Sequence, residues 1–251
     1  MIRACRWLVG VCLLAVPLGL AAPAPAEAQQ TIDVDLELVL LADATGSIDS
    51  AEIAFQRQGY AEAITDPEVI NAIQTTGRGR IALTYVEWAD ATSQHVVVDW
   101  TVIDGAASAK AFADALVAPP RQAFGRNAIG AALLFGKDMI ENNAHYGLRR
   151  VIDLSADSAN NWGGPTIAEA RDAVVAADIT INGLAVLCRT CSGRPISYDL
   201  EQAFADRIIG GFGAFVITAD SAETFSDAVR RKLILEIVGV TPPSDFAAYQ
   251  D

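Results

Sequence analysis

Oxygen-bearing side chains recur at alternate positions in one short segment, Asp43-Ala44-Thr45-Gly46-Ser47, directly after an apolar run. A carboxylate and two hydroxyls spaced in this way on a tight turn can all point at one spot. Gly46 allows the backbone to turn sharply there. Hard oxygen ligands of this kind suit Mg²⁺, Mn²⁺ or Ca²⁺ better than zinc or copper. The segment therefore predicts a site for a hard divalent cation.

Two further oxygen donors stand elsewhere in the sequence. Asp157 follows the apolar run 151–155, and Asn127 lies in the glycine-containing loop 125–130. If the runs before Asp43 and Asp157 are neighbouring parallel strands, both carboxylates lie at the carboxyl edge of the sheet, where open α/β sheets bind ligands. Carboxylates that close repel each other unless a cation lies between them. We therefore expect Asp157 to share the ion, with Asn127 as a neutral fifth ligand.

The elements that would position these residues are alternating apolar strands and amphipathic helices, typical of a mainly parallel sheet covered on both faces. The predicted strands are 34–42, 80–88, 95–102, 151–155, 179–187 and 214–218. The predicted helices are one that begins at Ser50 as N-cap and those at 106–117, 128–143, 166–177, 200–208 and 222–238. The link 90–93 is so short that strand 95–102 must be antiparallel to strand 80–88. The expected fold is doubly wound α/β, with six strands and one antiparallel edge strand.

Together these motifs resemble the metal-ion-dependent adhesion site of the von Willebrand factor type A superfamily. The order and spacing of the strands agree with that fold over essentially the whole chain after the first residues. Longer stretches are similar to an uncharacterised family of exported bacterial proteins within the superfamily. These stretches are 79–88, 149–155, 181–184 and 230–233.

The resemblance implies that Thr45 and Ser47 bind the ion through their hydroxyls, and that Asp43 and Asp157 hold it directly or through water. Mg²⁺ is the expected ion, with Mn²⁺ and Ca²⁺ as alternatives. A partner protein's Asp or Glu would complete the shell. Asn127 stands where the superfamily usually has Thr, and its oxygen reaches about 1.2 Å further. This change leaves weaker Mg²⁺ binding, a broader choice of ion, or contact through water alone as open outcomes.

The first 28 residues have the composition of a signal peptide. Arg3 and Arg6 precede an apolar run, 7–20, that is short for a membrane span, and Ala26-Glu27-Ala28 is a small-x-small cleavage site. We expect a mature chain from Gln29, one domain over 29–241 and a loosely held tail over 242–251. The alternative is an uncleaved anchor. The protein is expected to be exported, to the periplasm or outside the cell, with no membrane insertion after cleavage.

The formal net charge of −13 argues against nucleic acid and anionic membrane surfaces as partners. After signal cleavage Cys188 and Cys191 remain. In an oxidising compartment we expect them to form a local disulfide, because they stand in a loop-like context. The alternative is a redox pair of the thioredoxin kind.

No catalytic motif stands out, so we expect a protein-binding module of the adhesion type rather than an enzyme. Candidate partner contacts near the ion are Trp88, Asn160, Asn161 and Trp162. Trp88 has a core role as its alternative. The remaining hypotheses for the function are a scaffold domain with an empty ion site, a thiol oxidoreductase that uses Cys188 and Cys191, and an unrecognised metal-assisted hydrolase.

Overall fold

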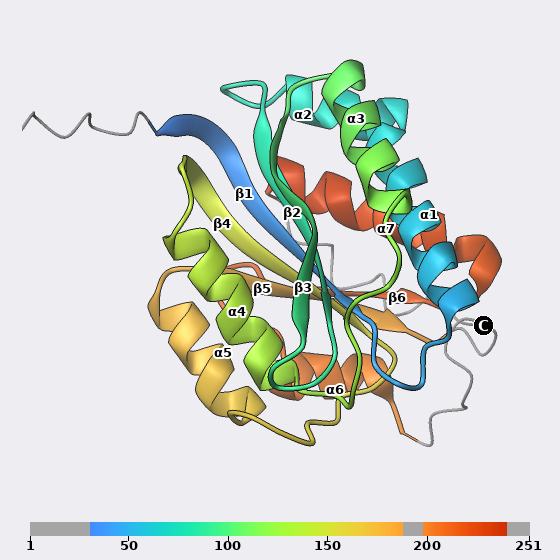
Figure 1. Ribbon diagram of the computed structural model, residues 1–251. Coiled ribbons are helices and arrows are strands. Elements are labelled where there is room, and N and C mark those ends of the chain that lie inside the picture. Colours follow the sequence, from blue (N-terminus) through green and yellow to red (C-terminus); the bar gives the residue numbers. More distant parts are fainter. Residues whose placement is uncertain (1–30, 188–197, 240–251) are drawn as a thin grey trace, which may run out of the picture. The chain divides into compact units, whose positions relative to one another are not determined.

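The computed structural model describes residues 31–187 and 198–239 (Figure 1). Its centre is a six-stranded sheet in the order β3-β2-β1-β4-β5-β6. The strands are β1 (Ile32–Asp43), β2 (Ile81–Trp88), β3 (Gln94–Ile103), β4 (His145–Ala156), β5 (Thr180–Val186) and β6 (Val216–Ala219). Neighbouring strands are parallel except β2 and β3, which are antiparallel. The fold class and the antiparallel edge strand predicted from the sequence are confirmed.

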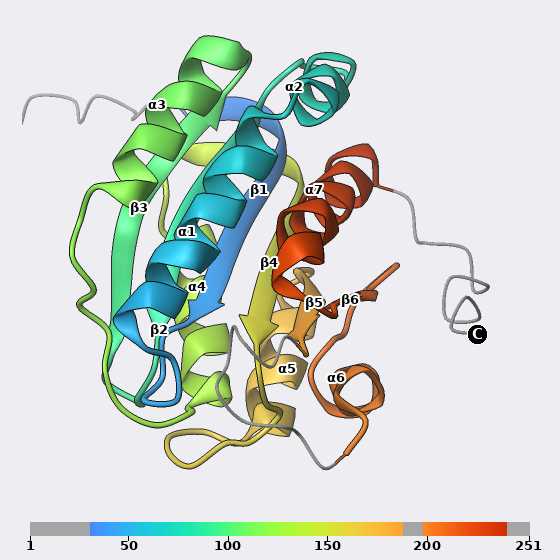
Figure 2. The same ribbon diagram turned by 90° about the vertical axis from the view of Figure 1, so that its right-hand side faces the viewer.

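Helices cover both faces of the sheet, as Figure 2 shows. One face carries α1 (Ser50–Thr65), α2 (Pro67–Gln74), α3 (Ala106–Val117) and α7 (Ala222–Val238). The other carries α4 (Ile129–Glu141), α5 (Ile167–Ala176) and α6 (Leu200–Arg207). Among the described residues, no helix is long and apolar enough to cross a membrane.

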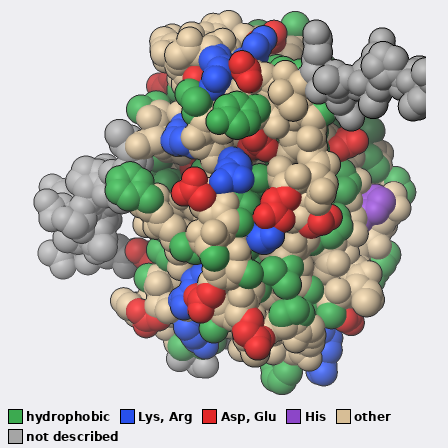
Figure 3. Space-filling view, turned by 90° about the vertical axis from the view of Figure 1, so that its left-hand side faces the viewer, with side chains coloured by type: hydrophobic (Ala, Val, Ile, Leu, Met, Phe, Trp, Pro, Cys, Tyr) green, Lys and Arg blue, Asp and Glu red, His purple; other side chains and the backbone are tan. Residues whose placement is uncertain are grey.

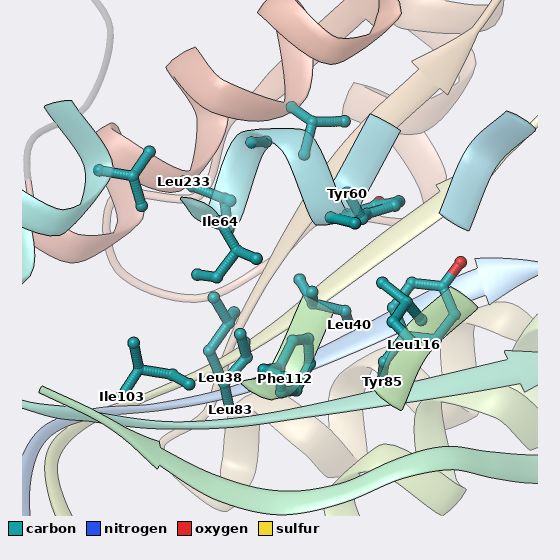
Figure 4. Packing of buried hydrophobic residues seen from close by; sticks show 14 of the residues in the cluster. Leu38, Leu40, Tyr60, Ile64, Leu83, Tyr85, Ile103, Phe112, Leu116 and Leu233 are labelled. Atoms are coloured by element: carbon teal, nitrogen blue, oxygen red, sulfur yellow. The ribbon is translucent and has the colours of Figure 1, made fainter. Parts of the chain in front are cut away.

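The core lies in two layers because successive side chains of a strand point to opposite faces. In β1, Leu38 and Leu40 pack beneath α1 and α3, whereas Val39 and Leu41 pack on the α4 side. Figure 4 shows the first layer, where strand residues meet Tyr60 of α1. A strand that is buried on both faces is apolar almost throughout. This burial explains why the sequence signal of β1 was strong.

Several boundaries differ from the sequence prediction. Asp49, not Ser50, is the N-cap of α1, and its carboxylate accepts hydrogen bonds from the backbone N–H groups of Ala51 and Glu52. Helix α2 was not predicted at all. It begins at Pro67, after the N-cap Asp66, which also ends α1. Proline at the first helical position after a capping aspartate is a known start signal, so the start of this helix could have been predicted from the sequence.

The strand order places a topological switch point between β1 and β4. The chain leaves β1 toward β2 on one side and returns to β4 on the other, where Ala42 pairs with Ser155. Ligands of open α/β sheets bind outside the carboxyl ends of strands at such a point. Asp43 and Asp157 therefore lie at the edge where a ligand is expected.

Candidate metal-ion site

The segment after β1 folds into a turn that presents its oxygen atoms to one spot. Oδ1 of Asp43 accepts a hydrogen bond of 2.8 Å from the backbone N–H of Thr45, which fixes the Asp43 carboxylate against the turn. The hydroxyl oxygens of Thr45 and Ser47 lie 3.1 Å apart. Asp43 and Thr45 are buried, while Ser47 is exposed. An ion held here would be reached from the solvent on the Ser47 side.

Asp157 joins this turn from the end of β4. The hydroxyl of Ser47 donates a hydrogen bond of 3.2 Å to Oδ2 of Asp157. The structure thus brings together Asp43, Thr45, Ser47 and Asp157, although Asp157 lies more than a hundred positions after the other three in the sequence. They are four of the five side chains that the sequence analysis predicted as ligands, the fifth being Asn127.

The electrostatics of this cluster favour a cation. Burial, together with the nearby charge of Asp157, raises the pKa of Asp43 to about 7. Burial also raises the pKa of Asp157. Oδ2 of Asp43 is buried and has no hydrogen-bond partner among the described residues. An unpaired buried carboxylate oxygen is costly unless a cation neutralises it, so the residues fit a divalent ion.

The donor set also limits the kind of ion. No cluster of three or more His, Cys, Asp or Glu side chains lies in a ligand arrangement in the described ranges. A cation between Asp43 and Asp157 would therefore rely on hydroxyl oxygens and water for the rest of its shell. Such a shell suits hard cations such as Mg²⁺, Mn²⁺ and Ca²⁺.

The loop between α3 and α4, residues 118–128, connects the site to three neighbouring segments. The carbonyl of Gly125 accepts a hydrogen bond of 2.8 Å from Gly46. The backbone N–H of Ala128 donates to Ala89, which follows β2, at 3.0 Å. The carbonyl of Asn127 accepts a bond of 2.7 Å from Trp162 in the loop after β4. This loop therefore fixes how the surrounding loops sit relative to one another.

Asn127 uses its side chain within this network. Its amide nitrogen donates a hydrogen bond of 2.9 Å to the hydroxyl of Ser158, next to Asp157. No hydrogen bond between described residues uses its amide oxygen. The residue thus lies beside the carboxylate of the candidate site, and its role as an ion ligand stays a prediction.

Arg121 is a site residue that the sequence reasoning missed. Its guanidinium donates hydrogen bonds to the carbonyls of Ala44, of Thr45 at 3.0 Å and of Ile48 at 2.6 Å. Its Nε donates to Ala123 at 2.9 Å. The planar, always-charged guanidinium suits this multiple contact. Arg121 thereby holds the turn that carries the oxygen ligands.

The predicted partner contacts divide into three kinds. Trp88 is fully buried, so it is a core residue and its predicted role as a partner contact is wrong. Asn161 is committed internally, because its side chain bonds to Gly130 at 3.1 Å and to Pro165 at 2.9 Å. Asn160 and Trp162 are exposed. Only these two are free to meet a partner.

Cys188 and Cys191, for which a disulfide was predicted, lie outside the described residues. The predicted tail 242–251 and the predicted signal peptide 1–28 also lie outside them.

The sequence model of a protein family described as "Protein of unknown function (DUF1194)" matches residues 33–241. The chain is a DUF1194 protein. A search of curated proteins finds no match to it. The family assignment agrees with the resemblance to a bacterial family of the von Willebrand factor type A fold.

Solved structures confirm that the DUF1194 chain has this fold. A von Willebrand factor type A protein from Catenulispora acidiphila matches with a TM-score of 0.58 and 15% identity, over 81% of this chain and 43% of that one. The pilus adhesin SpaC from Lactobacillus rhamnosus GG matches with a TM-score of 0.57 and 13% identity, over 81% and 30%. The chain thus spans less than half of either protein.

A third similar structure carries a metal. Proximal thread matrix protein 1 from the mussel byssus, with zinc in its MIDAS motif, matches at a TM-score of 0.53 and 16% identity, over 83% of this chain and 49% of that one. At this identity the similarity establishes the fold, since function belongs to the site.

Proposed function

We propose that this DUF1194 protein binds a partner protein through a divalent cation held by Asp43, Thr45, Ser47 and Asp157. The observation that carries the proposal is the buried, unpaired Oδ2 of Asp43 beside Asp157 at the switch point of the sheet. The pilus adhesin and the zinc-containing byssus protein support it, because both use the same fold. The proposal includes no catalytic step.

A partner carboxylate is the expected external ligand. The described side chains bring only two carboxylates to a dication, and the exposed position of Ser47 leaves one side open. An ion with few protein anions stays electrophilic and attracts an outside anion. Mg²⁺ is the ion we propose, with Mn²⁺ and Ca²⁺ as the tested alternatives. We further propose that the protein works after export, in the periplasm or outside the cell.

One observation favours a second candidate, a scaffold whose ion site is empty. The hydroxyl of Ser47 bonds to Asp157, and Arg121 holds the turn, so the loops are connected without an ion. The partner of such a scaffold would dock elsewhere. Ion titration distinguishes the two candidates.

The test is thermal unfolding of the wild type and of Asp43→Asn with Mg²⁺, Mn²⁺, Ca²⁺ or chelator. An ion that binds only the folded state, and is present at a concentration of one hundred times its Kd, raises the free energy of unfolding by about 2.7 kcal/mol. For a domain of this size that equals roughly 5–10 °C in Tm. We expect this shift in the wild type and none in Asp43→Asn.

Asp220→Ala is the matched control, because Asp220 is an exposed aspartate after β6. It should keep the full ion-dependent shift. A wild type whose Tm is the same in all three ions and in chelator would contradict the proposed ion site and favour the empty scaffold.

A further inference from the structure

We propose that the ion site is one part of a composite surface that docks an acidic peptide segment, and that Arg126, Trp162 and Phe124 form the other part. One carboxylate of the segment would complete the ion's shell, as the proposed function requires. A second carboxylate would pair with Arg126, and the intervening chain would lie on the aromatic rings. This inference rests on the proposed function and names the chemistry of its partner.

Two large aromatic side chains are exposed beside the ion site. Trp162 is 64% exposed and Phe124 is 59% exposed. They come from the loop after β4 and from the α3–α4 loop, and these loops also carry Asp157 and Asn127. Aromatic residues and arginine are enriched in protein interfaces, and Trp and Arg dominate binding hot spots. Their exposure on these two loops indicates a surface that a partner covers.

Arg126 supplies a positive charge on this surface that no described side chain pairs with. The guanidinium of Arg126 lies 5.4 Å from the ring centre of Trp162. Arg126 is exposed, and within the described part of the chain it forms neither a hydrogen bond nor an ion pair. A stacked guanidinium keeps its N–H edge free for a carboxylate, which it can bind in a bidentate manner. Arg121 differs, since its donors already bond to backbone carbonyls.

The surface is held in one shape before any partner arrives. The backbone of Trp162 donates to Asn127, the residue after Arg126, at 2.7 Å. The side chain of Asn161 accepts a hydrogen bond from Gly130 at the start of α4 and donates one to Pro165 in the loop after β4. It therefore connects this loop to α4. A second arginine, Arg121, lies 4.8 Å from the ring centre of Phe124. Such preorganisation lowers the entropic cost of binding.

Charge complementarity argues for an acidic occupant. The chain has a formal charge of −13, so most of its surface repels anions. Figure 3 shows a face on which acidic and basic side chains are interspersed, without a large patch of either sign. The composite surface differs, because the ion and Arg126 would place two cationic centres on neighbouring loops. Two carboxylates on one segment match them.

The experiment uses synthetic capped peptides with two glutamates separated by no, one, two or three glycines. Each peptide is titrated into the ¹⁵N-labelled protein with saturating Mg²⁺, and the shift of the Trp162 indole N–H signal, assigned with Trp162→Phe, gives Kd. We expect the best two-glutamate peptide to bind roughly tenfold tighter than its Glu→Gln forms, which equals about 1.4 kcal/mol. Chelator should abolish binding.

Arg126→Ala should remove this tenfold advantage and leave Mg²⁺ binding unchanged. Arg231→Ala, which removes an exposed arginine of α7, is the matched control and should bind the peptide as the wild type does. Trp162→Ala, in which Kd is read from the backbone N–H signals of the same loop because the indole is gone, should weaken every glutamate peptide, since it removes the shared stacking surface.

Equal affinity for one and two glutamates, or full peptide affinity in Arg126→Ala, would overturn this inference. If Mg²⁺ raises Tm and a single glutamate binds in its presence, the proposed function stands although the inference has failed. If Mg²⁺ itself does not bind, the proposed function fails first. The two failures are thus distinguishable.

Discussion

Arg121 shows how one residue organises the candidate site without touching an ion. Its side chain reaches backbone carbonyls that lie more than seventy positions earlier in the sequence. It is half-buried, and its charge faces carbonyl dipoles rather than a carboxylate. Arg121 therefore stabilises the turn that carries Thr45 and Ser47 through the backbone carbonyls of that turn.

We predict that Arg121→Ala weakens Mg²⁺ binding by about tenfold and lowers stability by about 1–3 kcal/mol, because buried carbonyls lose charged donors. Calorimetric titration and urea unfolding measure the two effects. Arg126→Ala removes the same charge from the same loop, and it should leave both quantities near the wild-type values. An Arg121→Ala protein with wild-type ion affinity would show that the turn holds itself.

Site residues could be predicted from the sequence where their partners are close along the chain, and were missed where their partners are distant. Asp43, Thr45 and Ser47 share one turn, so their spacing alone indicated a common target. Arg121 bonds to carbonyls, which every residue has, so no pattern in the sequence marks its partners. For Trp88 the sequence left two roles open, a partner contact and a core residue, and its full burial in β2 decides for the core.

At the scale of elements, α4 must approach the loop after β4 very closely. A Cβ atom added to Gly130 would lie 2.2 Å from the carbonyl oxygen of Pro165, which is impossible without a backbone shift. A Cβ added to Gly136 of the same helix would lie 3.1 Å from Cδ1 of Ile152, a flexible side-chain end. The two glycines therefore offer a matched comparison.

Gly130→Ala should destabilise the protein by about 1–3 kcal/mol and weaken ion binding, because the displaced loop carries Asp157. Gly136→Ala should change stability by less than about 1 kcal/mol, since the gain in helix propensity offsets the tight contact. Urea unfolding of both variants, with and without Mg²⁺, tests this pair. Equal behaviour would mean that the approach of α4 is not what positions the loop.

The neighbouring arginines of β4 stabilise helix ends on opposite faces of the sheet. Arg149 donates to the carbonyls of Glu236 and Ile237, each at 2.5 Å, at the end of α7. Arg150 donates to Ala177, just after α5, at 2.7 Å. Cations near a helix C-terminus interact favourably with its dipole and free carbonyls. The sequence stretch 149–155 thus links β4 to helices of both layers.

A buried charge cluster joins β4 to α7. Nζ of Lys232 lies 2.8 Å from Oδ1 of Asp153 and 2.5 Å from Oε1 of Glu236. Burial raises the pKa of Asp153 to about 7 despite the opposing charge of Lys232, and the charge of Glu236 contributes to this increase. Tyr60 of α1 faces the same carboxyl group, and burial raises the pKa of its own hydroxyl. One lysine cannot neutralise two carboxylates, so the carboxyl group of Asp153 stays protonated to a higher pH than an ordinary aspartate.

The sign of the pH dependence follows from this pKa. The folded state keeps the Asp153 proton where the unfolded state, with an ordinary pKa of 3.8, has lost it. Its stabilising contribution is complete below about pH 4 and declines as the pH rises to about 7. We predict that Asp153→Asn gains stability relative to the wild type by about 1 kcal/mol per pH unit between roughly pH 5 and 7. Urea unfolding at pH 5, 6, 7 and 8 measures the difference, and a constant difference would contradict the prediction.

The bounds of helices and strands could be predicted where a single hydrophobic period ran through the whole element. The bounds of α3 and α7 agree with the prediction, because both carry a clear helical period between distinct ends. The first half of β4, residues 145–150, was missed because its side chains alternate between exposed and partly buried positions and include two arginines. Its pairing with the start of β1 is a tertiary effect.

At the scale of the whole molecule, the proposed export is open to direct measurement. We predict that a bacterium with a general secretory system produces a mature protein that begins at Gln29, because Ala26 and Ala28 are small residues at the cleavage site. Intact-mass spectrometry of the periplasmic fraction identifies the start. A cytoplasmic product that retains Met1 would contradict the proposed localisation.

The described part of the chain begins and ends at the edge of the sheet away from the ligand turn. Ile32 opens β1, and Gly239 follows α7 beside Arg149, whereas Asp43 closes β1 about 36 Å further along at roughly 3.3 Å per residue. A tether joined close to Ile32 or Gly239 would hold the molecule at this edge and leave the ligand turn facing away from the support. Immobilisation on a sensor chip through a linker close to either residue should therefore leave the exposed Ser47 accessible to soluble analytes.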